Sequence, residues 1–190
     1  DMNTTYEYTD ALKVLLQGGC ILYPTDTIWG IGCDATNARA VEKVLLIKER
    51  PQKKTMIILV SGLDMLAHYV EEIPEVALDL MESITDPLTI IYPGARNLAK
   101  NLIAPDGSVA IRIPNELYCK GLIASLGRPI TSTSANISGS PHALSYGRIA
   151  PQIKNAVDYI VPYHQNEISI PRPSSVIRLG KDGEMQIIRS

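Results

Sequence analysis

The chain has 190 residues, with 18 lysines and arginines against 20 aspartates and glutamates and a net charge of -2. This length favours one domain with a substantial core, covering residues 1–190. The near-neutral charge argues against a dedicated nucleic-acid coat, and no apolar run approaches the ~20 residues of a membrane span.

Helical and strand patterns alternate in the first half of the chain. They predict, in order, a helix at 8–17, a strand at 20–23, a helix from 38 to the segment before Pro51, a strand at 56–60, and helices at 61–69 and 74–83. Gly18 and Gly19 end the first helix, Asn37 caps the second, and Pro74 suits the first position of the last. The run at 56–60 is continuously apolar, which is typical of a strand covered on both faces.

The second half of the chain is richer in strands. The patterns predict strands at 88–92 and 108–113 around a loop with one helical turn at most, a helix from the cap Asn115 to 126, a strand at 129–133, a short helix at 146–153, and strands at 157–161, 175–179 and 185–188. The turn at 180–183, GKDG, joins the last two strands as a hairpin. Helices alternating with strands, followed by a strand-rich tail, predict an α/β fold with a mixed sheet.

The three cysteines, Cys20, Cys33 and Cys119, fit no disulfide framework and no zinc site. Cys20 and Cys33 stand among apolar residues, so we expect buried thiols. The N-terminal segment carries acids and lacks the basic region of a signal peptide. These features favour a reducing, cytoplasmic location, without a membrane partner. The histidines are isolated, and we expect no metal site.

Positive charge is concentrated in residues 39–54, where six cations stand against two acids, whereas residues 55–95 hold seven acids and no lysine or arginine. Lys48 and Arg50 belong to the segment KERP at the predicted helix end. Cations at that end favour the helix dipole, which is a sufficient structural reason for them. They also form a focus for an anionic ligand if the helix stops near Lys48 and Arg50 lies in the turn that Pro51 favours.

Two polar segments follow predicted strands. Thr25, Asp26 and Thr27 come after the strand at 20–23, in a loop whose glycines lack the GxGxxG spacing; the chain also has no P-loop motif. The loop is therefore either a polar turn or a ligand-facing loop at a strand end. The segment TSTSANISG at 131–139 offers hydroxyls and backbone N–H groups, and is either an anion-binding nest or a serine-rich connector.

Two observations on single side chains sharpen this picture. Ser134 and Asn136 are two residues apart, so both face one side if the chain is extended there. Arg112 interrupts an otherwise apolar strand, and a buried arginine needs an anionic partner. That partner is either a protein acid or the carboxylate or phosphate of a ligand.

Taken together, these segments resemble the YrdC-domain family. They are YPTDTIWGIGCDA, KERP with the apolar strand after it, SVAIRIP, TSTSANISGSP, PSSVIR and the terminal IIR. The order and spacing match over essentially the whole chain, and the Lys48/Arg50 and Ser134/Asn136 pairs are the specific part. The resemblance implies an open, twisted, mixed α/β sheet flanked by helices, with a concave, positively charged cleft. It also implies the short, single-domain form, without the additional C-terminal domain of longer relatives.

The family resemblance implies L-threonylcarbamoyladenylate synthase activity, a nucleotidyl transfer. L-Threonine, bicarbonate and ATP, accompanied by Mg²⁺, yield threonylcarbamoyl-AMP and pyrophosphate. The product serves the N6-threonylcarbamoyladenosine modification at position 37 of tRNA, and other proteins transfer the group to the tRNA. The tripeptide Lys54-Thr55-Met56 and Leu59 depart from residues that relatives often carry, which leaves room for a paralogue of the same fold with another acceptor.

The same resemblance implies site residues by matching position. For threonine they are Thr27, Arg112, Ser134 and Ser174, with Arg112 on the substrate carboxylate. For ATP they are Lys48, Arg50, Lys54, Ser108, Asn136 and Arg189. Lys48 and Arg50 would also act in catalysis by stabilising the phosphates, and no residue would hold a resident metal. His142 is an additional candidate.

Two other classes of function remain open from the sequence. A non-catalytic module of the same fold would bind tRNA or double-stranded RNA by shape and phosphate contacts. The low aromatic content, 5%, and the absence of phenylalanine speak against it. An accessory domain of a larger carbamoyltransferase-type protein is the other class. The absence of acylphosphatase-like or zinc-finger-like segments speaks against that.

Overall fold

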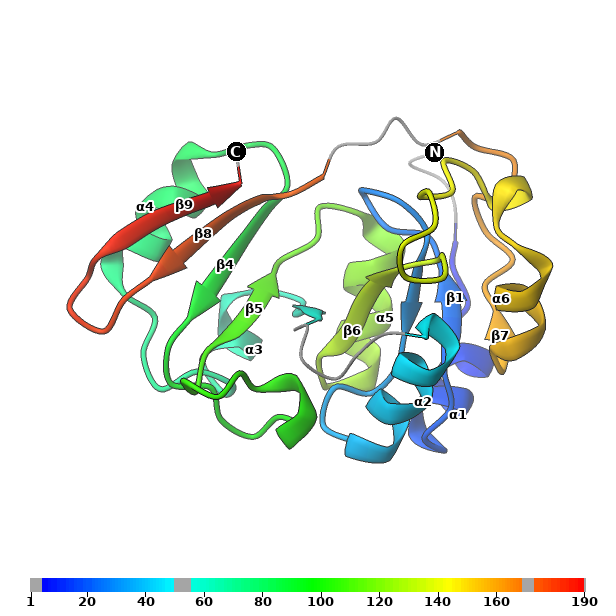
Figure 1. The fold of residues 1–190 in the computed structure, drawn as a ribbon, viewed down its shortest axis with the longest axis horizontal. Helices are drawn as coiled ribbons and strands as arrows, with labels where there is room; N and C mark the ends of the chain where they lie inside the picture. Colours follow the sequence, from blue (N-terminus) through cyan, green and yellow to red (C-terminus); the bar gives the residue numbers. More distant parts are fainter. Residues whose placement is uncertain (1–4, 50–55, 169–172, 190) are drawn as a thin grey trace.

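A computed structural model describes residues 5–49, 56–168 and 173–189. Within these residues nine strands form one sheet that runs across the molecule in the order β7-β1-β2-β6-β3-β5-β4-β8-β9 (Figure 1). The strands are β1 (Ile21–Tyr23), β2 (Gly30–Gly32), β3 (Ile57–Leu59), β4 (Leu88–Tyr92), β5 (Val109–Arg112), β6 (Ile130–Ser134), β7 (Tyr159–Ile160), β8 (Ser175–Leu179) and β9 (Met185–Arg189). The pairs β1/β7, β3/β5 and β4/β8 are parallel, whereas the other neighbours are antiparallel. The predicted mixed α/β sheet is confirmed.

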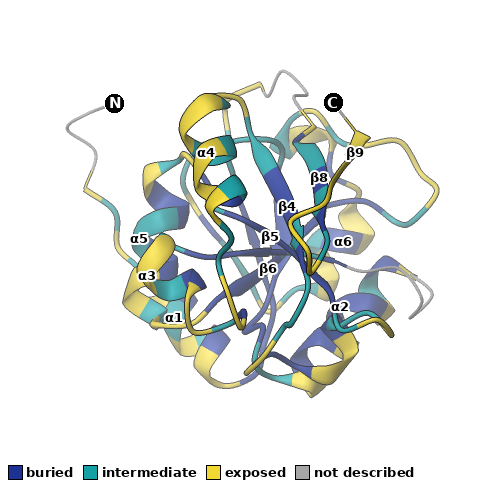
Figure 2. Ribbon diagram, turned by 90° about the vertical axis from the view of Figure 1, so that its left-hand side faces the viewer, coloured by how far each residue is buried: buried dark blue, intermediate teal, exposed yellow. Residues whose placement is uncertain are grey.

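Helices lie on both sides of the central strands, and their exposed residues point outward (Figure 2). They are α1 (Thr9–Leu16), α2 (Ala38–Lys48), α3 (Leu63–Leu66), α4 (Glu75–Ser83), α5 (Leu117–Leu126) and α6 (Pro151–Ala156), with 3₁₀ turns η1 (Lys100–Leu102) and η2 (Tyr146–Arg148). One apolar cluster joins α1 and α5 to Ile21, Tyr23 and Ile130 of the sheet. A larger cluster joins α2 to other strand residues, including Ile31 and Ile58.

Capping side chains begin two of the helices, α2 and α5. The Asn37 side chain accepts hydrogen bonds from two backbone N–H groups of α2, as predicted. Gly127 follows α5 with a φ of 73°, the left-handed conformation that ends helices. The predicted cap Asn115 is wrong, because the Glu116 carboxylate caps α5 through the N–H groups of Tyr118 and Cys119, at 2.9 and 2.8 Å.

Other boundaries also differ from the predictions; the strand predicted over 157–161, for example, is confined to β7. Pro74 stands at the cap of α4 rather than at its first helical position. The helix predicted over 61–69 is confined to α3. The helix predicted over 146–153 is divided into η2 and α6, because the backbone is extended at Ile149.

Strand β2 was not predicted, since the segment around it was interpreted as an irregular loop. It lies between β1 and β6 and pairs antiparallel with both. Glycine has low β-propensity, which hides the strand in the sequence. The structure shows why residue 32 is a glycine, because neighbouring side chains leave no room for a Cβ there. A Cβ there would lie 2.6 Å from Tyr23 Cε1 and 2.8 Å from Ile130 Cγ2.

We therefore expect Gly32→Ala to lower the free energy of unfolding by about 1–3 kcal/mol, as overpacking of a full core does. Chemical denaturation measures it. Gly147→Ala is the matched control, because no atom lies within 4 Å of a Cβ at that position. Equal denaturation midpoints for the two variants would contradict the tight packing between β2 and its neighbours.

The cysteines are all free and buried, as expected for Cys20 and Cys33. Burial raises the pKa of Cys20 to about 11 and that of Cys33 to about 12. Burial also raises the pKa of Cys119 well above its usual range. All three thiols are therefore protonated at neutral pH, which argues against a nucleophilic role. In the part of the chain that the structure describes, no helix is long and apolar enough to cross a membrane.

Candidate active site

A cavity of about 520 Å³ lies over one face of the central sheet. Its floor is built from alternate residues of neighbouring strands, since side chains two apart in a strand share a face. Thr89 of β4 stands opposite Arg112 of β5, and Ile91 stands opposite Ala110. The lining residues are Thr27, Ile28, Trp29, Gly30, Ile57, Thr89, Ile91, Ala110, Arg112, Ser132, Thr133, Ser134, His142, Pro173, Ser174, Val176 and Arg189.

Six of the sequence-predicted residues line this one cavity, although they come from distant parts of the chain. They are Thr27, Arg112, Ser134, Ser174, Arg189 and His142. The volume lies within the range of small-molecule sites. The lining combines apolar surface with several hydroxyl groups and two guanidinium groups, and no Asp or Glu is among the described lining residues. This composition suits an anionic ligand that also carries a hydroxyl group.

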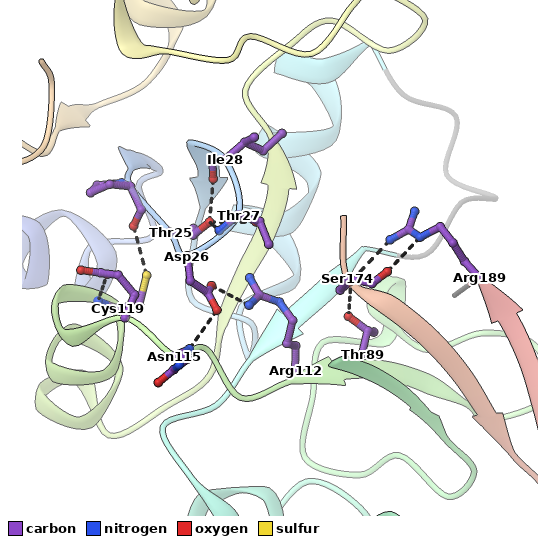
Figure 3. Close-up of polar contacts among 12 residues, drawn as sticks. Thr25, Asp26, Thr27, Ile28, Thr89, Arg112, Asn115, Cys119, Ser174 and Arg189 are labelled. Carbon is purple, nitrogen blue, oxygen red and sulfur yellow. Dashed lines mark hydrogen bonds and ion pairs between the residues drawn. The ribbon is translucent and has the colours of Figure 1, made fainter. Parts of the chain in front are cut away.

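Arg112 is the most buried cation of the cavity, with a side chain that is 2% exposed. Its Nη1 donates to Asp26 Oδ1 at 2.6 Å (Figure 3). Of the two partners that the sequence left open, the structure therefore supplies a protein acid. A guanidinium has five N–H donors. Among the described residues this bond to Asp26 is the side chain's one hydrogen bond, so further donors remain for a ligand in the cavity.

The loop after β1 holds Thr27 at the cavity through its own hydrogen bonds. Thr25 Oγ1 donates to the carbonyl oxygen of Ile28 at 2.6 Å. The same oxygen accepts from the backbone N–H of Thr27 at 3.0 Å and contacts Thr27 Oγ1 at 3.0 Å (Figure 3). These bonds fix the loop by local geometry, as in a polar turn, and Thr27 of the same loop also lines the cavity.

Ser174 lies between a buried threonine and an arginine (Figure 3). Thr89 Oγ1 and Ser174 Oγ are 2.7 Å apart. Arg189 Nε donates to the Ser174 carbonyl oxygen at 2.9 Å, and Arg189 Nη2 lies 3.4 Å from Ser174 Oγ. Thr89 was not predicted as a site residue. The signal in the sequence was a single threonine within the apolar run of β4.

Lys48 and Asn136 lie beside the cavity rather than in its lining. Lys48 is buried, and its Nζ donates to the Ser134 carbonyl oxygen at 2.6 Å, to Ser134 Oγ at 3.1 Å and to Asn136 Oδ1 at 2.9 Å. Ser134 Oγ also contacts Asn136 Oδ1, but the two residues are joined by a turn, in which the Asn136 N–H donates to the Ser134 carbonyl oxygen at 2.9 Å, and not by the extended chain that their spacing assumed. Asn136 Nδ2 donates to the Ser140 carbonyl oxygen at 2.7 Å. These contacts join α2 to the polar segment after β6.

Ser108 lies in an adjoining cavity of about 300 Å³. The two cavities share Ile91 and Ala110, so they are neighbours on the same face of the sheet. Ser108 donates from both N and Oγ to Asp106 Oδ1, at 2.9 and 2.6 Å, and these hydrogen bonds lower the pKa of Asp106. The predicted residues Arg50 and Lys54 lie outside the described residues.

The fold and the cavity define the class of protein. It is an open, mixed α/β sheet that carries a hydroxyl- and arginine-lined small-molecule cavity on one face. The family model Sua5_yciO_yrdC, described as "Telomere recombination", matches residues 13–190. The chain belongs to this Sua5/YciO/YrdC family, and the predicted family resemblance is confirmed.

Similar proteins extend this result over most of the chain. A threonylcarbamoyl-AMP synthase of Pseudoalteromonas translucida (strain TAC 125) is 36% identical over 154 residues, which are 80% of this chain and 82% of that protein. A protein of the same name from Xanthomonas euvesicatoria pv. vesicatoria (strain 85-10) is 32% identical over 183 residues, 95% of this chain and 98% of that protein.

Solved structures of Sua5 from P. abyssi share the fold. The complex with L-threonine has a TM-score of 0.83 at 28% identity and covers 93% of this chain. A variant of the same protein has a TM-score of 0.86 at 26% identity and covers 99% of this chain. The matches span 52% and 58% of the two Sua5 chains, so this chain spans somewhat more than half of Sua5.

Proposed function

We propose that this protein is a threonylcarbamoyl-AMP synthase, which joins L-threonine, bicarbonate and ATP into threonylcarbamoyl-AMP and releases pyrophosphate. The observation that carries the proposal is the buried guanidinium of Arg112, which lines the same cavity as the hydroxyl groups of Thr27, Ser134 and Ser174. A guanidinium binds a carboxylate through parallel N–H bonds, and hydroxyl groups accept or donate to the hydroxyl of threonine. The names of the two bacterial relatives support the same activity.

The proposed chemistry does not require a covalent nucleophile. An oxygen of threonine carbamate attacks the α-phosphate of ATP, and pyrophosphate leaves. Two anionic reactants must be brought together, so the protein supplies positioning and positive charge. Threonine would lie at Arg112, whereas the nucleotide would extend toward Ser108 across the adjoining cavity. Arg189, at the cavity, would contact the nucleotide.

The structure suggests a role for Lys48 that differs from the phosphate contact expected from the sequence. Its three ammonium donors are used by protein oxygens in the structure. We propose that Lys48 acts through Ser134, by fixing its hydroxyl and carbonyl groups at the cavity. A contact of Lys48 with phosphate would require one of these hydrogen bonds to be replaced. Arg50 and Lys54 remain proposed phosphate ligands.

Mg²⁺ fits this site as a companion of ATP rather than as a resident ion. In the described ranges, no group of three His, Cys, Asp or Glu residues could hold a metal. Mg²⁺ prefers oxygen ligands and commonly binds through substrate phosphates while keeping several waters. When bound, it would neutralise charge on the phosphate oxygens.

A non-catalytic RNA-binding module is the less supported alternative. Phosphate-backbone binding requires solvent-exposed cations, whereas the two candidate-site cations Lys48 and Arg112 are buried. The relatives named as synthases favour the enzyme as well. The transfer of the threonylcarbamoyl group to tRNA by partner proteins remains part of the proposal.

The test is a pyrophosphate-release assay with ATP, Mg²⁺ and bicarbonate, with and without L-threonine. We expect release that depends on threonine, and a product with the mass of threonylcarbamoyl-AMP. L-Valine replaces the hydroxyl of threonine with a methyl group of similar volume. It should be a poorer substrate by about 10-fold or more, because buried hydroxyl groups of the site lose their partner. Release that does not depend on threonine would contradict the assignment.

A further inference from the structure

Asp26 uses both carboxylate oxygens to join three segments of the fold. Oδ1 accepts from Arg112 Nη1 at 2.6 Å, and Oδ2 accepts from the backbone N–H of Asn115 at 2.9 Å (Figure 3). The first contact reaches the end of β5, and the second reaches the connection to α5. Asp26 itself lies in the loop after β1, beside Thr27. One side chain therefore sets the relative position of two candidate substrate-binding residues.

Asp26 acts from outside the proposed substrate cavity. It is absent from the described residues that line the 520 Å³ cavity, whereas it lines a second cavity of about 580 Å³. That second cavity takes Ile90 and Ile111 from the opposite face of β4 and β5. Asp26 therefore contacts Arg112 without lining the cavity in which the substrate would bind.

The physical need for this contact follows from burial. The Arg112 side chain is 2% exposed, and a buried cation without a counter-charge is costly. The pair with Asp26 provides that charge when the cavity is empty. It also fixes one edge of the planar guanidinium, so that the remaining N–H donors keep one orientation toward the cavity. A carboxylate bound by parallel hydrogen bonds depends on that orientation.

We propose that Asp26 is a positioning residue for the amino acid substrate. It orients Arg112 and the adjacent Thr27, and thereby sets the affinity for the substrate carboxylate without acting on the nucleotide. This inference rests on the proposed function, because it takes Arg112 as the group that binds the amino acid.

The first experiment compares Asp26→Asn with Asp26→Glu. Asparagine has nearly the same shape and still accepts from Asn115, but it removes the negative charge. We expect the KM for threonine to rise about 10- to 100-fold, as for loss of other residues that orient a binding group. The KM for ATP should stay nearly unchanged. Asp26→Glu restores the charge and should recover part of the threonine affinity. Asp79→Asn, an exposed acid of α4, is the matched control and should change neither constant.

A rise of both KM values by the same factor, or no rise for threonine, would overturn the inference. If Asp26→Asn does not fold, Asp26→Glu carries the test, with a smaller rise of the threonine KM expected. A merely structural role would lower the melting temperature without separating the two substrates.

A second measurement separates this inference from the proposed function. Melting temperatures of Asp26→Asn, Arg112→Gln and the double variant form a thermodynamic cycle without any ligand. We expect the shift of the double variant to be smaller than the sum of the single shifts, whatever the enzyme turns over. Additive shifts of the melting temperature would contradict an interaction between Asp26 and Arg112. Absence of threonine-dependent turnover in the unaltered protein, together with non-additive shifts, would refute the proposed function and leave the pair intact.

Discussion

Replacing Arg112 with alanine should reduce threonine-dependent pyrophosphate release by about 10²- to 10³-fold, the usual loss for a charge-binding group in an active site. The guanidinium is buried, lines the proposed substrate cavity and has donors beyond the one that Asp26 uses. The variant should also lose about 3 kcal/mol of unfolding free energy, because Asp26 is left without its charged partner. Arg112→Lys should keep more stability than activity, since lysine retains the charge and lacks the planar fork.

Arg128→Ala is the control for the Arg112 variants. Arg128 also pairs with an aspartate, since its Nη1 lies 2.9 Å from Asp34 Oδ2, but its side chain is 48% exposed. Turnover of this variant should stay close to that of the unaltered protein. If Arg112→Ala retained full turnover while losing stability, Arg112 would be a structural ion-pair residue and the threonine pocket would have to lie elsewhere.

Replacing Lys48 with methionine should reduce turnover by about 10²-fold, because small displacements of positioned groups have effects of this size. Methionine fills the space but makes none of the three hydrogen bonds to Ser134 and Asn136. The loss of these hydrogen bonds to a charged group should lower the unfolding free energy by about 1.5–3 kcal/mol. Steady-state kinetics and chemical denaturation measure the two effects.

Lys43→Met is the matched control in the same helix. Lys43 is exposed, and its Nζ reaches the Gly18 carbonyl oxygen at 3.3 Å, far along the chain from Ser134. It should leave turnover unchanged. If the turnover of the Lys48 variant were also unchanged, Lys48 would only stabilise the C-terminal end of α2.

The sequence predicted those parts of the fold that depend on local patterns. The strand β8 has the predicted bounds, and α2 begins after the predicted cap Asn37. It missed β2, because two of its three residues are glycines and the role of Gly32 appears only where Tyr23 and Ile130 approach it. It also chose Asn115 over Glu116 as a cap. The backbone N–H of Asn115 is bound by Asp26, a contact that no local pattern reveals.

The segments of the candidate site could be predicted from the sequence, but their contacts could not. Ser134 and Asn136 do touch, but through a turn in which the Asn136 N–H donates to the Ser134 carbonyl oxygen, rather than through the extended chain that the spacing argument assumed. Local sequence patterns did not predict the contacts that join distant segments. Lys48 meets Ser134 across 86 residues, and Arg112 meets Asp26 across 86 residues. The sequence predicted that Arg112 needs an anionic partner. Only the folded structure shows that this partner is a protein acid, Asp26.

A crystal structure with L-threonine and a non-hydrolysable ATP analogue tests the central claim most directly. We predict threonine in the 520 Å³ cavity, with its carboxylate on the free N–H donors of Arg112 and its hydroxyl among Thr27, Ser134 and Ser174. Threonine bound at another place, with Arg112 contacting Asp26 alone, would contradict the claim.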